Sequence, residues 1–139
     1  MRFIILTQYY PPETGAPQNR LHSLARNLLA AGHDVEVMTA MPNYPKMRIF
    51  EAYRGKLFAH DKIDGVPVSR SWIYVSESKS MLPRLVNYFS FVFTSLLGGF
   101  RRHRCDYVIC ESPPLFLGMS AWVLAKWKGA RLIFNVSDL

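Results

Sequence analysis

The sequence has little cysteine and no pattern of metal ligands. Cysteine occurs only at positions 105 and 110, and the four histidines are scattered without the short spacings that zinc sites use. Neither a structural metal nor a disulfide framework is predicted, so a reducing cytoplasm is the natural setting. We expect no metal ion and no cofactor.

Two signatures of nucleotide-binding proteins are missing as well. No G-x-G-x-x-G follows the first apolar run, which disfavours an ordinary dinucleotide-dependent dehydrogenase, and no Walker P-loop occurs. The fully uncharged stretch 85–100 is shorter than the span of about 20 residues that crosses a bilayer. The sequence therefore predicts neither of these enzyme classes and no membrane-spanning helix.

Acidic residues are few, and the chain is basic. It has 17 Lys and Arg against 10 Asp and Glu, a formal net charge of +7. Such a surface favours nucleic acid, anionic lipid or a phosphorylated substrate. The densest basic group, Arg101, Arg102 and Arg104, directly follows an apolar stretch, and no basic-aromatic motif is present. We therefore expect a membrane surface or a phosphorylated ligand as partner and no nucleic acid.

Short apolar runs alternate with segments of helical spacing. The runs are typical of strands buried on both faces and occupy residues 3–6, 35–39, 107–110 and 132–136. Helical spacing is found over residues 21–29, 80–102 and 115–127. Strand, helix and strand within the first forty residues form the βαβ pattern. We predict an α/β, Rossmann-like fold: an open, mostly parallel sheet with helices on both faces.

A small β-hairpin insertion is also predicted in the middle of the chain. Residues 57–60 and 66–71 have the composition of short strands, and they flank Asp64-Gly65. This dipeptide is typical of tight hairpin turns.

Polar and turn-forming residues follow each predicted strand, where open α/β sheets bind their ligands. The segment 15–20 opens the first helix, whose free amides favour an anion such as a phosphate, and Arg20 adds positive charge there. The same segment also fits a plain helix-opening turn with Arg20 in solvent. Asp138 is placed to act as a base or to hold a sugar hydroxyl, but it equally fits a helix N-cap. The candidate site residues are Gly15, Ala16, Arg20, Asn43, Glu111, Ser112 and Asp138.

The expected helix over residues 81–102 is apolar nearly all round. Such a helix is either buried between the sheet and a partner domain or embedded in a membrane surface. The flanking arginines suit shallow insertion at an anionic surface. In that second interpretation the membrane-contact residues are Phe89, Phe93, Arg101, Arg102 and Arg104.

Several short segments, in this order and spacing, resemble the N-terminal domain of the family 4 glycosyltransferases. The resemblance covers essentially the whole chain and is closest to bacterial transferases of O-antigen and other surface polysaccharides, of the fucosamine transferase type. The segments that carry it are residues 5–13, 20–25, 32–37, 41–45, 53–56, 64–66, 87–88, 112–114 and 137–139.

The resemblance implies one half of a two-domain GT-B enzyme. Residues 1–139 would form the acceptor-binding domain, truncated before the C-terminal domain that binds the nucleotide sugar. It implies metal-independent transfer with retention of configuration, from a UDP-linked nucleotide sugar to a glycan on polyprenyl pyrophosphate. The enzyme would be cytoplasmic and peripheral at the inner face of the membrane. Gly15 matches the family's glycine-rich loop, Ala16 stands where many members have a second glycine, and Asp138 matches an aspartate near the reacting sugar.

Two functions of other classes remain open at this point. The chain is alternatively a stand-alone module that binds an anionic sugar or nucleotide, or a membrane-peripheral interaction protein. We expect negligible turnover from these residues alone, because a transition state assembled between two domains is not stabilised by one of them.

Overall fold

The computed structural model describes residues 1–8, 10–11, 16–42, 49–75, 81–100, 105–112 and 117–136. For residues 16–18, 84, 99–100, 111–112, 117–120 and 134–136 the description is of the backbone only.

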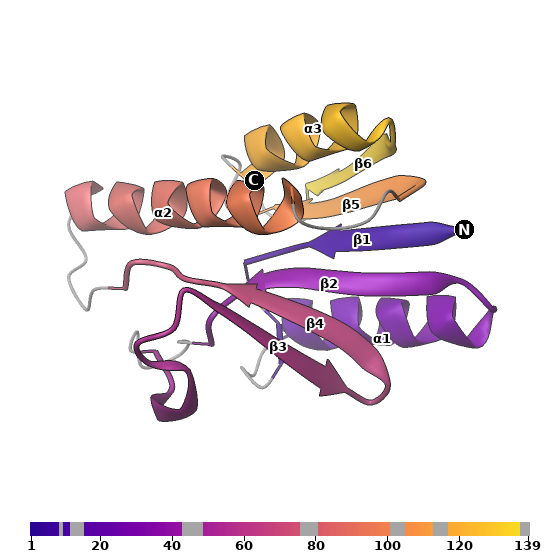
Figure 1. Cartoon of the computed structure of the whole chain (residues 1–139), viewed down its shortest axis with the longest axis horizontal. Coiled ribbons are helices and arrows are strands. Elements are labelled where there is room, and N and C mark those ends of the chain that lie inside the picture. Colours follow the sequence, from indigo (N-terminus) through magenta and orange to yellow (C-terminus); the bar gives the residue numbers. More distant parts are fainter. Residues whose placement is uncertain are drawn as a thin grey trace.

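In the described part of the chain, one sheet of six strands forms the centre (Figure 1), in the spatial order β3-β4-β2-β1-β5-β6. All neighbouring pairs are parallel except β3 with β4. The open, mostly parallel sheet predicted from the apolar runs is therefore confirmed. The strands are β1 (Arg2–Leu6), β2 (Asp34–Ala40), β3 (Phe58–Ile63), β4 (Val66–Ser71), β5 (Tyr107–Ser112) and β6 (Arg131–Val136).

Helices cover both faces of the sheet, as predicted. α1 (Ala16–Ala30) lies on one face, and α2 (Met81–Phe100) and α3 (Leu117–Lys128) lie on the other. A 3-10 turn, η1 (Glu51–Tyr53), precedes β3. Gly32 and Gly129 follow α1 and α3 with φ of 91° and 65°, the left-handed conformation that ends helices and that glycine adopts without a steric penalty.

The continuous apolar runs form strands because both of their faces are covered. Ile5 points to the α1 side and packs in a cluster with Leu21 and Val37, while Leu6 points to the α2 side and packs with Met38 and Phe91. Alternation along each strand sends successive side chains to these two clusters. Burying this apolar surface is the main source of stability, at roughly 25 cal/mol per Å².

The predicted hairpin is confirmed, and it is part of the main sheet. β3 and β4 pair in antiparallel register around Asp64 and Gly65, both at positive φ. β4 then pairs in parallel with β2, from Val37 opposite Val68 to Ala40 opposite Ser71. The hairpin thus extends the sheet by two strands at the edge beyond β2.

α2 has one buried and one exposed side. Phe91 is fully buried, and at Gly98 the helix lies so close to Ser71 and Phe58 that an added Cβ would come within 3.4 Å of both side chains. Between them, Thr94 donates a hydrogen bond to the carbonyl of Trp72. Among the described residues, no helix has both the length and the apolar character needed to cross a membrane.

Candidate functional site

The carboxyl ends of the five parallel strands lie on one edge of the sheet. In Figure 1 the arrowheads of β1 and β2 point toward this edge. Thr7 and Gln8 continue from β1 on this edge, and Met41 and Pro42 continue from β2; all four are buried. α2 begins beyond this edge and runs back over the sheet. This edge, called the carboxyl edge below, is where the sequence analysis predicts that a ligand binds.

The structure locates part of the predicted site. α1 begins at Ala16, no acidic residue occupies its first turn, and the exposed Arg20 follows one turn later. Glu111 and Ser112 are the last two residues of β5, at the carboxyl edge. Phe89 and Phe93 lie on the exposed side of α2. Gly15, Asn43, Asp138, Arg101, Arg102 and Arg104 lie outside the described residues.

A buried arginine, which the sequence pattern did not single out, connects three segments at this edge. The guanidinium of Arg70 donates from Nε to Asp61 (2.7 Å), from Nη1 to the carbonyl of Ala40 (3.2 Å) and from Nη2 to the carbonyl of Pro11. The Arg70 side chain is fully buried and that of Asp61 is one-quarter exposed. A charge so deeply buried requires a partner of opposite sign and saturated hydrogen bonding.

Asp61 receives a second hydrogen bond, from the hydroxyl of Tyr53 at 2.6 Å. Burial raises the pKa of the Asp61 carboxyl, but the hydrogen bonds from Tyr53 and Arg70 and the positive charge of Arg70 outweigh it, so the pKa lies below its ordinary value of 3.8. Asp61 is therefore ionised at neutral pH and balances the arginine.

A second polar chain anchors the residue next to Pro11. The hydroxyl of Tyr10, which is fully buried, is 2.5 Å from Nδ1 of His22, and Nε2 of His22 is 2.7 Å from Asp64. Burial raises the pKa of Tyr10 far above its ordinary value, so the phenol keeps its proton. Tyr10, α1 and the hairpin turn are thus joined by two consecutive hydrogen bonds.

Replacing Tyr10 by phenylalanine is expected to lower the free energy of unfolding by about 1 kcal/mol, the usual net value of one such hydrogen bond. The ring stays buried, and the hydrogen bond to His22 is lost. The matched control is Tyr74→Phe, because Tyr74 is 37% exposed and its replacement should change the free energy by less than about 0.5 kcal/mol. Urea denaturation of both variants measures the difference, and equal values would contradict the assignment.

Two buried polar side chains, Gln8 and Thr39, lie near the ends of β1 and β2. Gln8 donates from Nε2 to Oδ1 of Asn87 (3.0 Å), and Asn87 donates to the carbonyl of Tyr74, which fixes α2 against the end of β1. Among the described residues, Oε1 of Gln8 and Oγ1 of Thr39 are buried without a hydrogen-bond partner.

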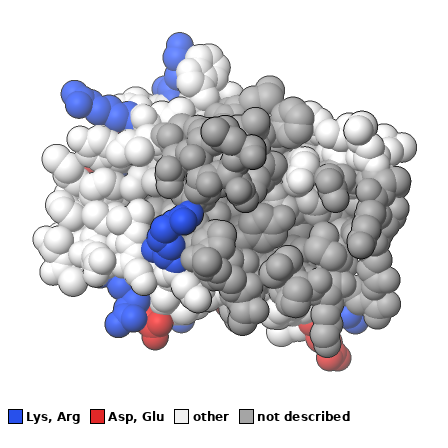
Figure 2. All heavy atoms as spheres, turned by 180° about the vertical axis from the view of Figure 1, so that it is seen from behind, with Lys and Arg blue, Asp and Glu red and all other residues white. Residues whose placement is uncertain are grey.

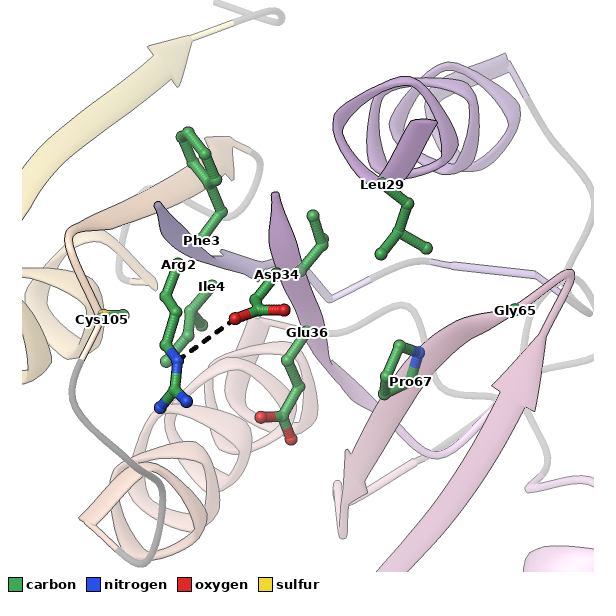
Figure 3. A pocket seen from close by; sticks show the side chains of 10 residues that line it. Arg2, Phe3, Ile4, Leu29, Asp34, Glu36, Gly65, Pro67 and Cys105 are labelled. Atoms are coloured by element: carbon green, nitrogen blue, oxygen red, sulfur yellow. Dashed lines mark ion pairs between the residues drawn. The ribbon is translucent and has the colours of Figure 1, made fainter. Parts of the chain in front are cut away.

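A surface cavity lies at the opposite, amino edge of the sheet (Figure 3). Its volume is about 340 Å³, and Arg2 and Asp34 form an ion pair of 3.5 Å at its rim. The apolar part of the wall includes Ile4 and Pro67. None of the predicted site residues that the structure describes lines this cavity, which lies at the edge opposite the carboxyl edge.

On the face shown in Figure 2, the described charged side chains are dispersed. The described Lys and Arg side chains on this face lie as separate groups and form no continuous patch. Within the part of the chain that the structure describes, no cluster of His, Cys, Asp and Glu has the composition of a metal site.

An open, mostly parallel sheet with helices on both faces and buried polar residues at the carboxyl edge defines a Rossmann-like domain. A domain of a hydrogenase from Pyrococcus furiosus has the same fold, with a TM-score of 0.59 over 96% of this chain and 89% of that one. At 14% identity, this likeness shows the fold alone.

The sequence comparison identifies the family. The model of the glycosyl transferase 4-like domain matches residues 15–139, and the chain belongs to this family. It is also 31% identical over 140 residues to WcaI of Escherichia coli (strain K12), which is named as a candidate glycosyl transferase of colanic acid biosynthesis. The match covers 99% of this chain and 34% of that relative, so the chain spans about a third of its length. The resemblance to GT-B transferases of family 4 is therefore confirmed.

Proposed function

We propose that this chain is the N-terminal, acceptor-binding domain of a two-domain, retaining glycosyltransferase of cell-surface polysaccharide synthesis. The enzyme transfers a hexosyl or amino-sugar group from a nucleotide sugar, UDP-linked in our proposal, to a glycan carried on polyprenyl pyrophosphate. The family match over residues 15–139 carries the proposal. A relative named for colanic acid biosynthesis supports a role in polysaccharide synthesis.

The start of α1 supports a role in binding phosphate. The N–H groups of Ala16, Gln18 and Asn19 in its first turn have no intrahelical acceptor, Pro17 has no N–H, and no acidic residue in this turn competes for them. The positive end of the helix dipole favours the charge that develops on a departing diphosphate. We assign Gly15, Ala16 and Arg20 to this phosphate region.

The remaining polar residues of the carboxyl edge are assigned to the sugars. Asn43, Glu111 and Ser112 bind acceptor hydroxyls, and Asp138 holds the reacting sugar or accepts its proton. The C-terminal domain of the full-length enzyme binds most of the nucleotide sugar and closes over this edge, so the 139-residue chain alone is inactive. No metal ion takes part in this proposal.

The exposed side of α2 supports contact with a membrane surface. Five apolar side chains spaced by three or four residues lie on it and are 40–73% exposed: Leu82, Val86, Phe89, Phe93 and Leu97. This stripe precedes the basic residues Arg101, Arg102 and Arg104, which suit anionic headgroups. We therefore place the enzyme in the cytoplasm, at the inner face of the cell membrane, where a lipid-linked acceptor is within reach.

Replacing Phe89 and Phe93 by serine is expected to weaken binding to anionic vesicles roughly tenfold for each residue. Moving one phenylalanine out of water is worth about 1.5–3 kcal/mol when complete, and 1.4 kcal/mol corresponds to tenfold. Flotation with phosphatidylglycerol vesicles measures the effect. Trp122→Ser is the matched control, because Trp122 is 53% exposed on the neighbouring helix α3. If the double variant floats as well as the wild type, α2 is not the membrane contact.

The enzymatic proposal is tested with the full-length protein and a panel of UDP-sugars, using membranes that hold polyprenyl-pyrophosphate-linked glycans. Mass spectrometry of the extracted lipids should show one added sugar with one donor. Binding of a donor or glycan without any transfer would favour a stand-alone sugar- or nucleotide-binding module instead.

A further inference from the structure

Three segments that are distant in the sequence meet at the guanidinium of Arg70. Nη2 contacts Pro11 in the segment that follows β1, Nη1 contacts Ala40 at the end of β2, and Nε contacts Asp61 in β3. The two carbonyls belong to the two chain segments that lead to Gly15 and to Asn43. A single side chain thus connects the starting points of both.

This arrangement gains little from charge pairing alone. A buried ion pair is often replaced by apolar residues without loss of stability, because the cost of desolvation offsets the attraction. An apolar side chain would fill the same space beneath the loops. An apolar side chain does not, however, donate hydrogen bonds to several acceptors at once. The planar guanidinium of arginine does, and no other side chain has this geometry.

The hairpin holds the segment after β1 at two adjacent residues. Arg70, in β4, contacts the carbonyl of Pro11, and Asp64, in the hairpin turn, contacts Tyr10 through His22. The first contact is to the main chain of the half-buried Pro11, and the second is to the side chain of the buried Tyr10. The hairpin therefore determines where this segment leaves the sheet.

We propose that Arg70 is a positioning residue of the transfer reaction, which sets the spacing between the segment that leads to Gly15 and the segment that leads to Asn43. The inference rests on the proposed function, because those segments carry the phosphate- and sugar-binding residues assigned above. The Arg70 side chain is fully buried, so the proposed role is exerted through these two segments. A misplacement of about 1 Å at a reacting centre costs on the order of 100-fold in rate.

The variants Arg70→Lys and Arg70→Met separate positioning from charge balance. Lysine keeps the positive charge beside Asp61, but one ammonium nitrogen does not occupy the three positions of Nε, Nη1 and Nη2. Tyr53→Phe is the matched control, since it removes a donor to Asp61 and leaves the contacts with Pro11 and Ala40 intact. All are made in the full-length enzyme.

Hydrogen exchange of peptides covering residues 7–16 and 40–49 is measured together with kcat and KM. In Arg70→Lys we expect exchange in these peptides to accelerate at least about tenfold while peptides of β5 and α3 stay unchanged. We also expect kcat/KM to fall about 10–100-fold in Arg70→Met, and by a similar factor in Arg70→Lys although lysine keeps the positive charge. Tyr53→Phe should resemble the wild type in both measurements.

Two results would overturn the inference. Wild-type exchange and kcat/KM in Arg70→Lys would show that the charge alone matters. Acceleration spread evenly over all peptides would show that Arg70 stabilises the whole fold without positioning these segments. If the wild type transfers no sugar, the proposed function fails and no reaction remains for Arg70 to position, and localised exchange would then support only the structural link to Pro11 and Ala40.

Discussion

Replacing Phe91 by alanine is expected to lower the free energy of unfolding by about 3–5 kcal/mol, the range for a large aromatic side chain removed from a packed core. Phe91 is fully buried where α2 meets the sheet, in the cluster that contains Leu6 and Met38 on the strands and Leu124 on α3. Two contributions add up to this loss: the favourable free energy of burying the ring is no longer gained, and a cavity remains in the core. Urea denaturation measures it directly.

Phe93→Ala on the same helix is the matched control. Phe93 is two residues away and 64% exposed, so its removal should change the free energy of unfolding by less than about 0.5 kcal/mol. The pair also tests how α2 divides between a core side and a surface side. Equal losses in the two variants would mean that the helix is seated in a different orientation.

Asp61→Asn is expected to cost roughly 3 kcal/mol, the lower end of the range for removing one partner of a buried ion pair. The Asp61 side chain is 26% exposed, which screens part of the interaction, but the Arg70 guanidinium left behind is fully buried. Asparagine keeps the shape and one acceptor oxygen, so the change isolates the charge. A loss below about 0.5 kcal/mol would show that the pair contributes no more than an exposed one.

The same carboxylate makes stability depend on pH in acid. Because the pKa of Asp61 is lower in the folded state than its ordinary value of 3.8, its contribution is fully present well above pH 3.8 and is lost as the pH falls through the folded-state pKa. Asp61→Asn should therefore lose less stability than the wild type between neutral pH and about pH 3. Denaturation at several pH values shows whether the two curves converge in acid.

The order of strands and helices was predictable because both faces of the sheet are covered. Residues 3–6 and 107–110 are continuous apolar runs, and such runs arise where helices lie on both faces of parallel strands. The Asp64-Gly65 turn was predictable because both positions require positive φ. Local composition sufficed in each case.

The place of the hairpin and the division of α2 depend on tertiary structure. Val66–Ser71 was predicted as a strand of a hairpin, but its proline, arginine and two serines gave no sign that it pairs in the main sheet with β2. α2 is apolar nearly all round, so sequence periodicity does not tell the side that holds Phe91 from the side that holds Phe93. Only the contacts with β2, β4 and α3 make the distinction.

The polar cluster at the carboxyl edge was not predicted for a related reason. Arg70 contacts Pro11 across 59 positions of sequence, and Tyr10 reaches Asp64 only through His22. No short motif encodes such a set. The signal that was present is the alternation Val66, Val68, Arg70, which puts a charged residue on the same face of the strand as two apolar ones and so requires a buried partner.

The most direct test of the central claim is sugar transfer by the full-length enzyme and its Gly15→Val and Asp138→Asn variants, measured in membranes with the donor that the wild type uses. We predict that the wild type transfers one sugar to the lipid-linked acceptor. In both variants, with folding verified by circular dichroism, we predict a loss of about 100-fold or more in kcat, as expected when a group that stabilises transition-state charge is removed or blocked. Undiminished transfer in both variants would contradict the placement of the site at the carboxyl edge of this domain.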